Sequence, residues 1–158
     1  MNKYEELNQE AYDQGVLVKE VCLRSNSDGL YKNKKIAINK NTLSTIPEKT
    51  CVLAEELGHY YTSYGNILDL SDIKNARQEY QARLYAYNEL VGLYGLINAW
   101  KANCRTKHEI CEYLNITEKF FDDALECYKS KYGVYTVVDD HIIIFQPNLN
   151  IQNYFNSL

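Results

Sequence analysis

Two adjacent carboxylates and a histidine lie close together in residues 52–60, which read Val-Leu-Ala-Glu-Glu-Leu-Gly-His-Tyr. On an α-helix, Glu55 and His59 are about one turn apart, so their side chains lie one above the other on the same face. Glu56 lies at the margin of that face. An imidazole and two carboxylates held in this way are able to support metal-assisted hydrolysis. The same spacing also occurs on an ordinary charged helix face, and the motif alone leaves both interpretations open.

Zinc hydrolases of the helical type use two metal ligands one turn apart, usually written His-Glu-x-x-His, in which the glutamate is the general base. This chain keeps that register, but Glu55 stands where the first histidine usually is. A carboxylate also binds zinc, so the register still allows coordination. Glu79 is the best candidate for a third ligand. If its helix packs antiparallel against the first, Glu79 faces His59, and Ala82 and Ala86 allow the two helices to approach closely.

Local signals predict the helices that carry these residues. Thr45, Pro47 and Glu48 form a helix start with a capping box, and we expect this helix to run to about Ser63 and to stop at Gly65. A loop over residues 66–70 would lead to a second long helix over residues 72–100, with a break near one of two glycines, Gly92 and Gly95.

The remaining elements are short. Upstream of the motif we expect a helix over residues 3–14, a valine-rich strand over residues 16–23, and strands at residues 30–32 and 35–38 joined by a tight hairpin at Asn33-Lys34. Downstream, a capping box at residues 106–109 starts a short helix, and Thr117 caps a further helix that ends before Gly133. Residues 134–145 then predict a hairpin in which His141 is exposed. The tail from residue 148 carries no clear signal.

The composition is that of one compact globular domain. The 158 residues are 46% hydrophobic and 24% charged, which is enough apolar material for a core. The net charge of −4 argues against a nucleic acid or an anionic membrane as the main partner. The sequence has no apolar run long enough to cross a membrane and no signal-peptide core at its start, so we expect a cytoplasmic protein. Five scattered cysteines, an odd number, indicate reduced thiols.

Two further constellations are weaker. Cys104, His108 and Cys111 have nearly helical spacing, but a cap at Thr106 would place Cys104 outside the helix, so packed thiols and a surface histidine are favoured over a second metal site. The pair of helices over residues 106–131 suggests DNA binding, but the outer face of the second is rich in carboxylates, which phosphates would repel. A protein partner suits that surface better.

Residues 52–60, followed by Glu79, Ala82 and Ala86, resemble the ImmA/IrrE family of metallo-endopeptidases, which is found in phages, mobile elements and bacterial stress responses. The family pattern is His-Glu-x-x-His-Tyr or a close relative, and then a helix with Glu-x-x-Ala-x-x-x-Ala. The upstream helix, strand and hairpin follow the order of the family, as do the turn at residues 109–117 and the segment at residues 142–147.

The resemblance implies a zincin-like, gluzincin-type site with Glu55, His59 and Glu79 as metal ligands and Glu56 as the general base. The cofactor would be Zn²⁺, or Mn²⁺ because two carboxylates make a harder ligand set. The fold class would be α+β in a single domain, with a small mainly antiparallel sheet beside the helices. Residues 1–100 would form the metallopeptidase-like core, and residues 101–158 a C-terminal helix-turn-helix and hairpin portion packed on it.

Family members of the ImmA kind act on helix-turn-helix repressors of their own element. The resemblance therefore implies a metal-dependent endopeptidase that cleaves such a transcriptional repressor, without direct contact to nucleic acid or membrane. Because Glu55 departs from the family pattern, the alternative is a catalytically inactive member that binds a repressor or another regulator without cleaving it. A toxin–antitoxin partner is a third interpretation.

Overall fold

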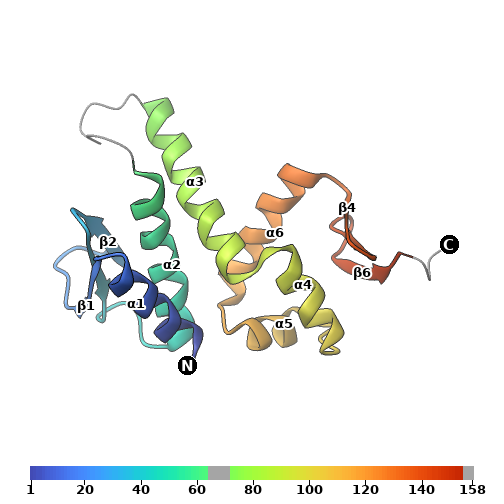
Figure 1. The fold of residues 1–158 in the computed structure, drawn as a ribbon, viewed down its shortest axis with the longest axis horizontal. Helices are drawn as coiled ribbons and strands as arrows, with labels where there is room; N and C mark the ends of the chain where they lie inside the picture. The colour runs from blue at the N-terminus through green and yellow to red at the C-terminus, as the bar shows by residue number, and fades with distance from the viewer. Residues whose placement is uncertain (64–71, 155–158) are drawn as a thin grey trace. The chain divides into compact units, whose positions relative to one another are not determined.

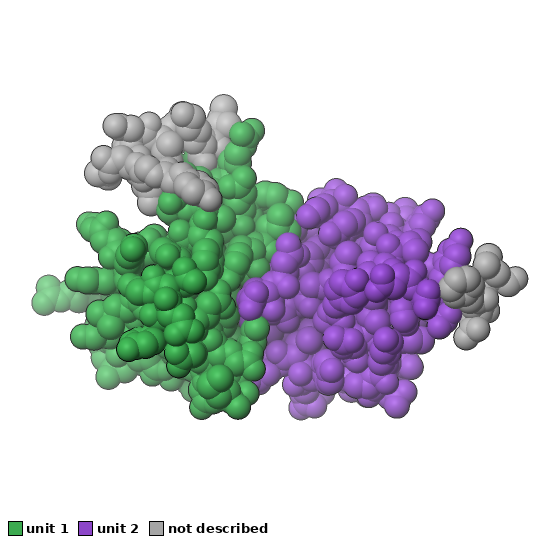
Figure 2. Space-filling view, in the orientation of Figure 1, with its two compact units in different colours: residues 1–86 green, residues 87–158 purple. Residues whose placement is uncertain are grey.

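The computed structural model describes residues 1–63 and 72–154, which form two compact units, Met1–Ala86 and Tyr87–Leu158 (Figure 2). The predicted helix end at Gly65 and the predicted loop over residues 66–70 lie outside the described residues. The predicted division into a core and a C-terminal portion at residue 100 stays a prediction.

The first unit combines a three-stranded sheet with helices (Figure 1). Its elements are α1 (Lys3–Asp13), β1 (Leu17–Val21), β2 (Gly29–Lys32), β3 (Lys35–Asn39), α2 (Ile46–Thr62) and the first part of α3 (Asp72–Leu90). The predicted capping box at the start of α2 is confirmed, since the Thr45 side chain accepts a hydrogen bond from the Glu48 backbone and Glu48 reciprocates. Asn2 and Glu5 form the same box at the start of α1.

The strand order in this sheet is β1-β3-β2. The predicted hairpin is confirmed, because β2 and β3 are antiparallel and Asn33 and Lys34 between them have φ values of 50° and 58°, as a tight two-residue turn requires. In contrast, β1 runs parallel to β3. The crossover from β1 to β2 is held by the buried Asn39, whose side chain bonds the backbone of Leu23, Ser27 and neighbouring loop residues.

The core of the first unit lies between the sheet and the helices. α1 packs against β1, and α2 packs against β2 and β3. The large, fully buried apolar side chains come from α1, β3 and α2 and include Leu7, Ile36, Ile38, Leu53 and Leu57. Burial of this one face of the sheet fixes which residues of β2 and β3 point toward α2.

α2 and α3 lie side by side and touch at their backbones (Figure 1). A Cβ atom added at Gly58 would lie 3.0 Å from the Cα atom of Ala82 and would also meet its carbonyl group. Ala82 and Ala86 are fully buried. The predicted close approach of the two helices is therefore confirmed, and Gly58 is the residue on α2 that permits it.

The second unit is made of helices and an antiparallel sheet. It contains α4 (Gly92–Lys101), α5 (Lys107–Leu114), α6 (Glu118–Tyr132), β4 (Tyr135–Val138), β5 (His141–Ile144) and β6 (Asn150–Asn153). The predicted break in the long helix is confirmed at Val91, before Gly92 with its φ of 64°. The predicted capping box of α5 and the Thr117 cap of α6 are also present. Both sheets together are mainly antiparallel, as predicted, with β1–β3 as the parallel pair.

Two features of the second unit differ from expectation. The unassigned tail supplies β6, which pairs with β5 although only Ile151 in it is both apolar and buried. The prediction of an exposed His141 is wrong: the side chain is 9% exposed and its ring lies edge-on against Trp100, with 5.7 Å between the ring centres. The contact with Trp100 buries His141, although its position beside a turn suggested that it would be exposed to solvent.

The contact between α2 and α3 makes a prediction about Gly58→Ala. The added methyl group meets the backbone of Ala82, which cannot move aside as a flexible side chain would, so the helices must separate. Overpacking of this kind costs roughly 1–3 kcal/mol. Chemical denaturation should show a lower free energy of unfolding. Gly95→Ala is the matched control, since its new Cβ atom would meet only Leu114 Cδ2 at 3.6 Å; equal stability of the two variants would contradict the close contact.

Candidate active site

A cleft of about 520 Å³ lies between β2, α2 and α3 within the first unit. It is lined by residues of all three elements: Gly29, Leu30, Tyr31, Glu56, His59, Ser63, Asn75, Gln78 and Glu79. Three of the four residues that the sequence singled out, Glu56, His59 and Glu79, therefore face the same space. The helical repeat places Glu56 and His59 on one face of α2, and Ser63 follows at the C-terminal end of that helix.

Glu56 is partly buried between α2 and β2. A Cβ atom on Gly29 would lie 2.6 Å from Val52 Cγ1 and 3.0 Å from Glu56 Oε1, so the absence of a side chain lets β2 pass directly over the carboxylate. Burial and the nearby negative charges of Glu55 and Glu79 raise the pKa of Glu56 to about 7. A carboxyl group with this pKa takes up and releases protons near neutral pH.

His59 and Glu79 meet across the contact between α2 and α3. His59 Nε2 lies 3.5 Å from Glu79 Oε1, and the side chains are 26% and 54% exposed. The expectation that Glu79 faces His59 is confirmed by this distance. The contact at Gly58 and Ala82 explains it, since Gly58 precedes His59 in α2 and Ala82 lies about one turn after Glu79 in α3.

Glu55 takes a different position from the other three. It is partly exposed and is absent from the residues that line the cleft, although its charge is felt by Glu56. Within residues 1–63 and 72–154, no three side chains of His, Cys, Asp or Glu are grouped closely enough to hold a metal ion. The structure thus assembles an imidazole–carboxylate pair, and the roles predicted for the four residues stay predictions.

A tyrosine network ties α2 and α3 to α1. The hydroxyl groups of Tyr61 and Tyr85 both donate to Glu10 Oε1, at 2.6 and 3.0 Å, and their ring centres are 5.0 Å apart. Burial and the hydrogen bond to Glu10 raise the pKa of Tyr61, so its hydroxyl keeps its proton. Because both tyrosine hydroxyl groups donate to the same Glu10 carboxylate, these hydrogen bonds stabilise the spacing of α1, α2 and α3 beside the cleft.

Sequence reasoning missed several residues of the cleft. Asn75 and Gln78 lie one turn and one residue before Glu79 on α3, so the helical repeat could have placed them on its face. Gly29, Leu30 and Tyr31 line the cleft from β2, and the sequence alone does not show that this strand packs against α2. On α5, His108 is exposed and pairs with Glu112 at 3.3 Å, as the interpretation of a surface histidine predicted.

Comparison with known proteins identifies the family to which this chain belongs. The family model Peptidase_M78, described as the IrrE N-terminal-like domain, matches residues 11–126. This match spans well over half of the chain, and the protein belongs to that family. Membership indicates a metal-dependent peptidase activity in general terms. A search of curated proteins gives no match. No helix among the described residues combines the length and apolar character needed to cross a membrane.

The raised pKa of Glu56 predicts a pH dependence of stability in protein kept free of metal. Between the ordinary carboxyl pKa of 4.5 and about 7, the folded state holds a proton that the unfolded state has lost. The free energy of unfolding therefore falls as pH rises through this range and levels off above it. Glu56→Gln removes this contribution, so denaturation across the range should show the wild type losing stability relative to the variant. A difference in the free energy of unfolding between wild type and variant that stays constant across this pH range would contradict the buried position of Glu56.

Proposed function

We propose that this protein is a cytoplasmic metal-dependent endopeptidase that cleaves a helix-turn-helix transcriptional repressor of a phage or mobile element. The observation that carries the proposal is the cleft that brings Glu56 beside the His59–Glu79 pair in a chain of the IrrE N-terminal-like family. The resemblance to the ImmA/IrrE family supports the substrate class. β2 lines the cleft and is an edge strand of its sheet, so an extended segment of another chain placed along it would lie close to the three side chains.

Glu56 is proposed as the general base. The pKa of Glu56 is about 7 in the metal-free protein, and the ionised form of this carboxyl would accept a proton from the attacking water as the oxygen bonds to the scissile carbonyl carbon. It then passes that proton to the departing amine as the carbon–nitrogen bond breaks. Gly29 positions this carboxylate, since a side chain there would push Glu56 from its place.

Glu55, His59 and Glu79 are proposed to hold the divalent metal ion. The donor chemistry fits at two of these positions, because an imidazole and a carboxylate already face each other at the cleft. Glu55 lies one helical turn from His59 on α2, and in the proposed metal-bound state its side chain would turn toward the ion. A Zn²⁺ or Mn²⁺ ion held there would polarise the scissile carbonyl.

Cleavage of a helix-turn-helix repressor tests the catalytic part of the proposal, and a repressor encoded next to this gene would be the substrate of choice. Purified protein with added Zn²⁺ or Mn²⁺ should cut the repressor, as seen by electrophoresis and mass spectrometry of the fragments. Glu56→Gln should lower the rate by roughly 10²–10⁴-fold, the usual contribution of a general base. Glu6→Gln, which removes an exposed carboxylate from α1, is the control and should cut normally. An equally active Glu56→Gln variant would refute the role of Glu56.

Metal uptake is a separate measurement. After treatment with chelator and dialysis against Zn²⁺ or Mn²⁺, elemental analysis should find bound metal in the wild type and a strong reduction in His59→Ala, Glu79→Ala and Glu55→Ala. His108→Ala is the control, because it removes an exposed histidine from α5. Retention of metal by Glu55→Ala alone would exclude Glu55 from the ligand set. Failure of the wild type to bind either ion would remove the metal from the proposal.

The second candidate is a non-catalytic protein that binds a repressor or another regulator. It is favoured by Glu55 in place of the usual histidine and by the lack of a three-ligand group in the described parts of the chain. Co-purification with an intact repressor, unchanged by added metal and by Glu56→Gln, would support this binder over the enzyme.

A further inference from the structure

The outer face of the β1-β3-β2 sheet carries a hollow of about 450 Å³ that the proposed activity does not use. Ala37 lies at its centre on β3, paired with Lys19 on β1 and with Leu30 on β2. In the next row, Lys35 on β3 is paired with Leu17 and Lys32. We call this surface the lysine-rimmed hollow. The small side chain of Ala37 between larger neighbours makes the depression.

The apolar part of the hollow is open to solvent. Leu17 is 49% exposed and Leu30 is 47% exposed, whereas Ile36 and Ile38, which alternate with Ala37 along β3, are buried on the other face. A single exposed leucine needs no explanation. Two on neighbouring strands that frame one depression form a surface able to take an apolar side chain.

The charged residues that line the hollow are all positive. Its lining contains Lys19, Lys32 and Lys35 and no carboxylate. Within the residues that the structure describes, none of these three lysines makes an ion pair. Glu20, next to Lys19 in β1, is engaged elsewhere, by Tyr4 at 2.7 Å and by Lys49 at 3.1 Å. A local cluster of unpaired positive charge thus stands on a chain whose net charge is −4.

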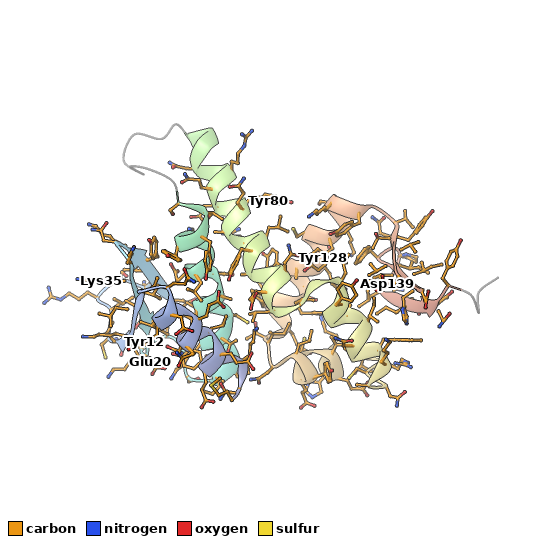
Figure 3. All side chains as sticks on the ribbon, in the orientation of Figure 1. Tyr12, Glu20, Lys35, Tyr80, Tyr128 and Asp139 are labelled. Atoms are coloured by element: carbon orange, nitrogen blue, oxygen red, sulfur yellow. The ribbon has the colours of Figure 1, made fainter. Side chains whose placement is uncertain are left out.

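Protection of sheet edges explains only part of this pattern. Lysines on edge strands discourage pairing with other chains, and β1 and β2 are the edges of this sheet. Lys35 lies on the central strand β3, where no edge needs protection. Lys35 also projects outward from the sheet (Figure 3). Three lysines around an apolar centre are instead complementary to an apolar side chain flanked by carboxylates.

We propose that the lysine-rimmed hollow binds an acidic segment of a partner protein, with one apolar side chain seated over Ala37 and carboxylates paired with Lys19, Lys32 and Lys35. A nucleic acid is a poorer fit, because the lining has no arginine and no aromatic ring for base stacking. β2 separates this surface from the cleft, and Leu30 lines both. The proposal stands independently of cleavage, since it requires only binding.

The test uses the full chain and an array of short synthetic peptides in which Asp or Glu flank one Leu or Phe, beside matched peptides with Asn or Gln. The wild type should bind acidic members selectively, and more weakly as salt is raised. Changing Lys19, Lys32 and Lys35 together to Gln should weaken binding by about tenfold or more, since three exposed ion pairs are lost. The control changes Lys107, Lys119 and Lys129 to Gln, which alters the net charge equally at lysines already paired in the second unit.

A second variant, Ala37→Leu, fills the hollow and keeps every charge, so it should also reduce binding of the acidic peptides. Circular dichroism and thermal unfolding establish that each variant is folded, and the lysine variant decides the matter if Ala37→Leu fails to fold. Equal binding of acidic and amide peptides, or equal binding by the lysine variant and its control, would overturn the proposal. So would capture of a DNA duplex through the same lysines when no acidic peptide binds.

Discussion

The contact between the backbones of Gly58 and Ala82 is the constraint on which the candidate site depends. It sets the distance between α2 and α3, and that distance decides whether His59 and Glu79 meet. A side chain at position 58 would meet the backbone of Ala82 and push α2 and α3 apart, which would separate the imidazole from the carboxylate. The buried Ala86 continues the small-residue contact along α3. Tyr61 and Tyr85, both bound to Glu10, hold the same helices from another side.

A second glycine contact defines the opposite wall of the cleft. Gly29 allows β2 to lie directly against Val52 and Glu56 on α2, and this burial is the main cause of the raised pKa of Glu56. The two glycines therefore have different effects. Gly58 lets His59 and Glu79 approach each other from two helices, and Gly29 lets β2 shield the Glu56 carboxylate from water. Neither glycine has φ > 0, so close approach of neighbouring atoms, and not backbone conformation, explains why each is small.

The elements that sequence reasoning predicted well are those specified by neighbouring residues. Thr45 and Glu48 cap α2 through contacts three residues apart, and Asn33-Lys34 fixes the β2–β3 hairpin within its own turn. The pairing of His59 with Glu79 was predictable because two helical repeats and two alanines restrict how α2 and α3 pack. The parallel pairing of β1 with β3, the polar strand β6 and the burial of His141 depend on residues distant in the chain. No local pattern distinguishes those arrangements from their alternatives.

The negative charges around His59 link the stability of this region to what it is able to bind. The negative charges of Glu55 and Glu79 both raise the pKa of Glu56. Without a cation, a protonated Glu56 carries no charge, and this reduces the repulsion among the three carboxyl groups. A divalent cation close to these carboxylates reduces the repulsion instead and lowers the pKa of Glu56. By thermodynamic linkage, if a bound cation lowers the pKa of Glu56, then ionisation of Glu56 must raise the affinity for the cation by the same free energy. The charges of Glu55 and Glu79, which add to the effect of burial on the pKa of Glu56, would thus also favour a cation. Under the proposed function, a bound cation would leave Glu56 ionised, as a general base must be.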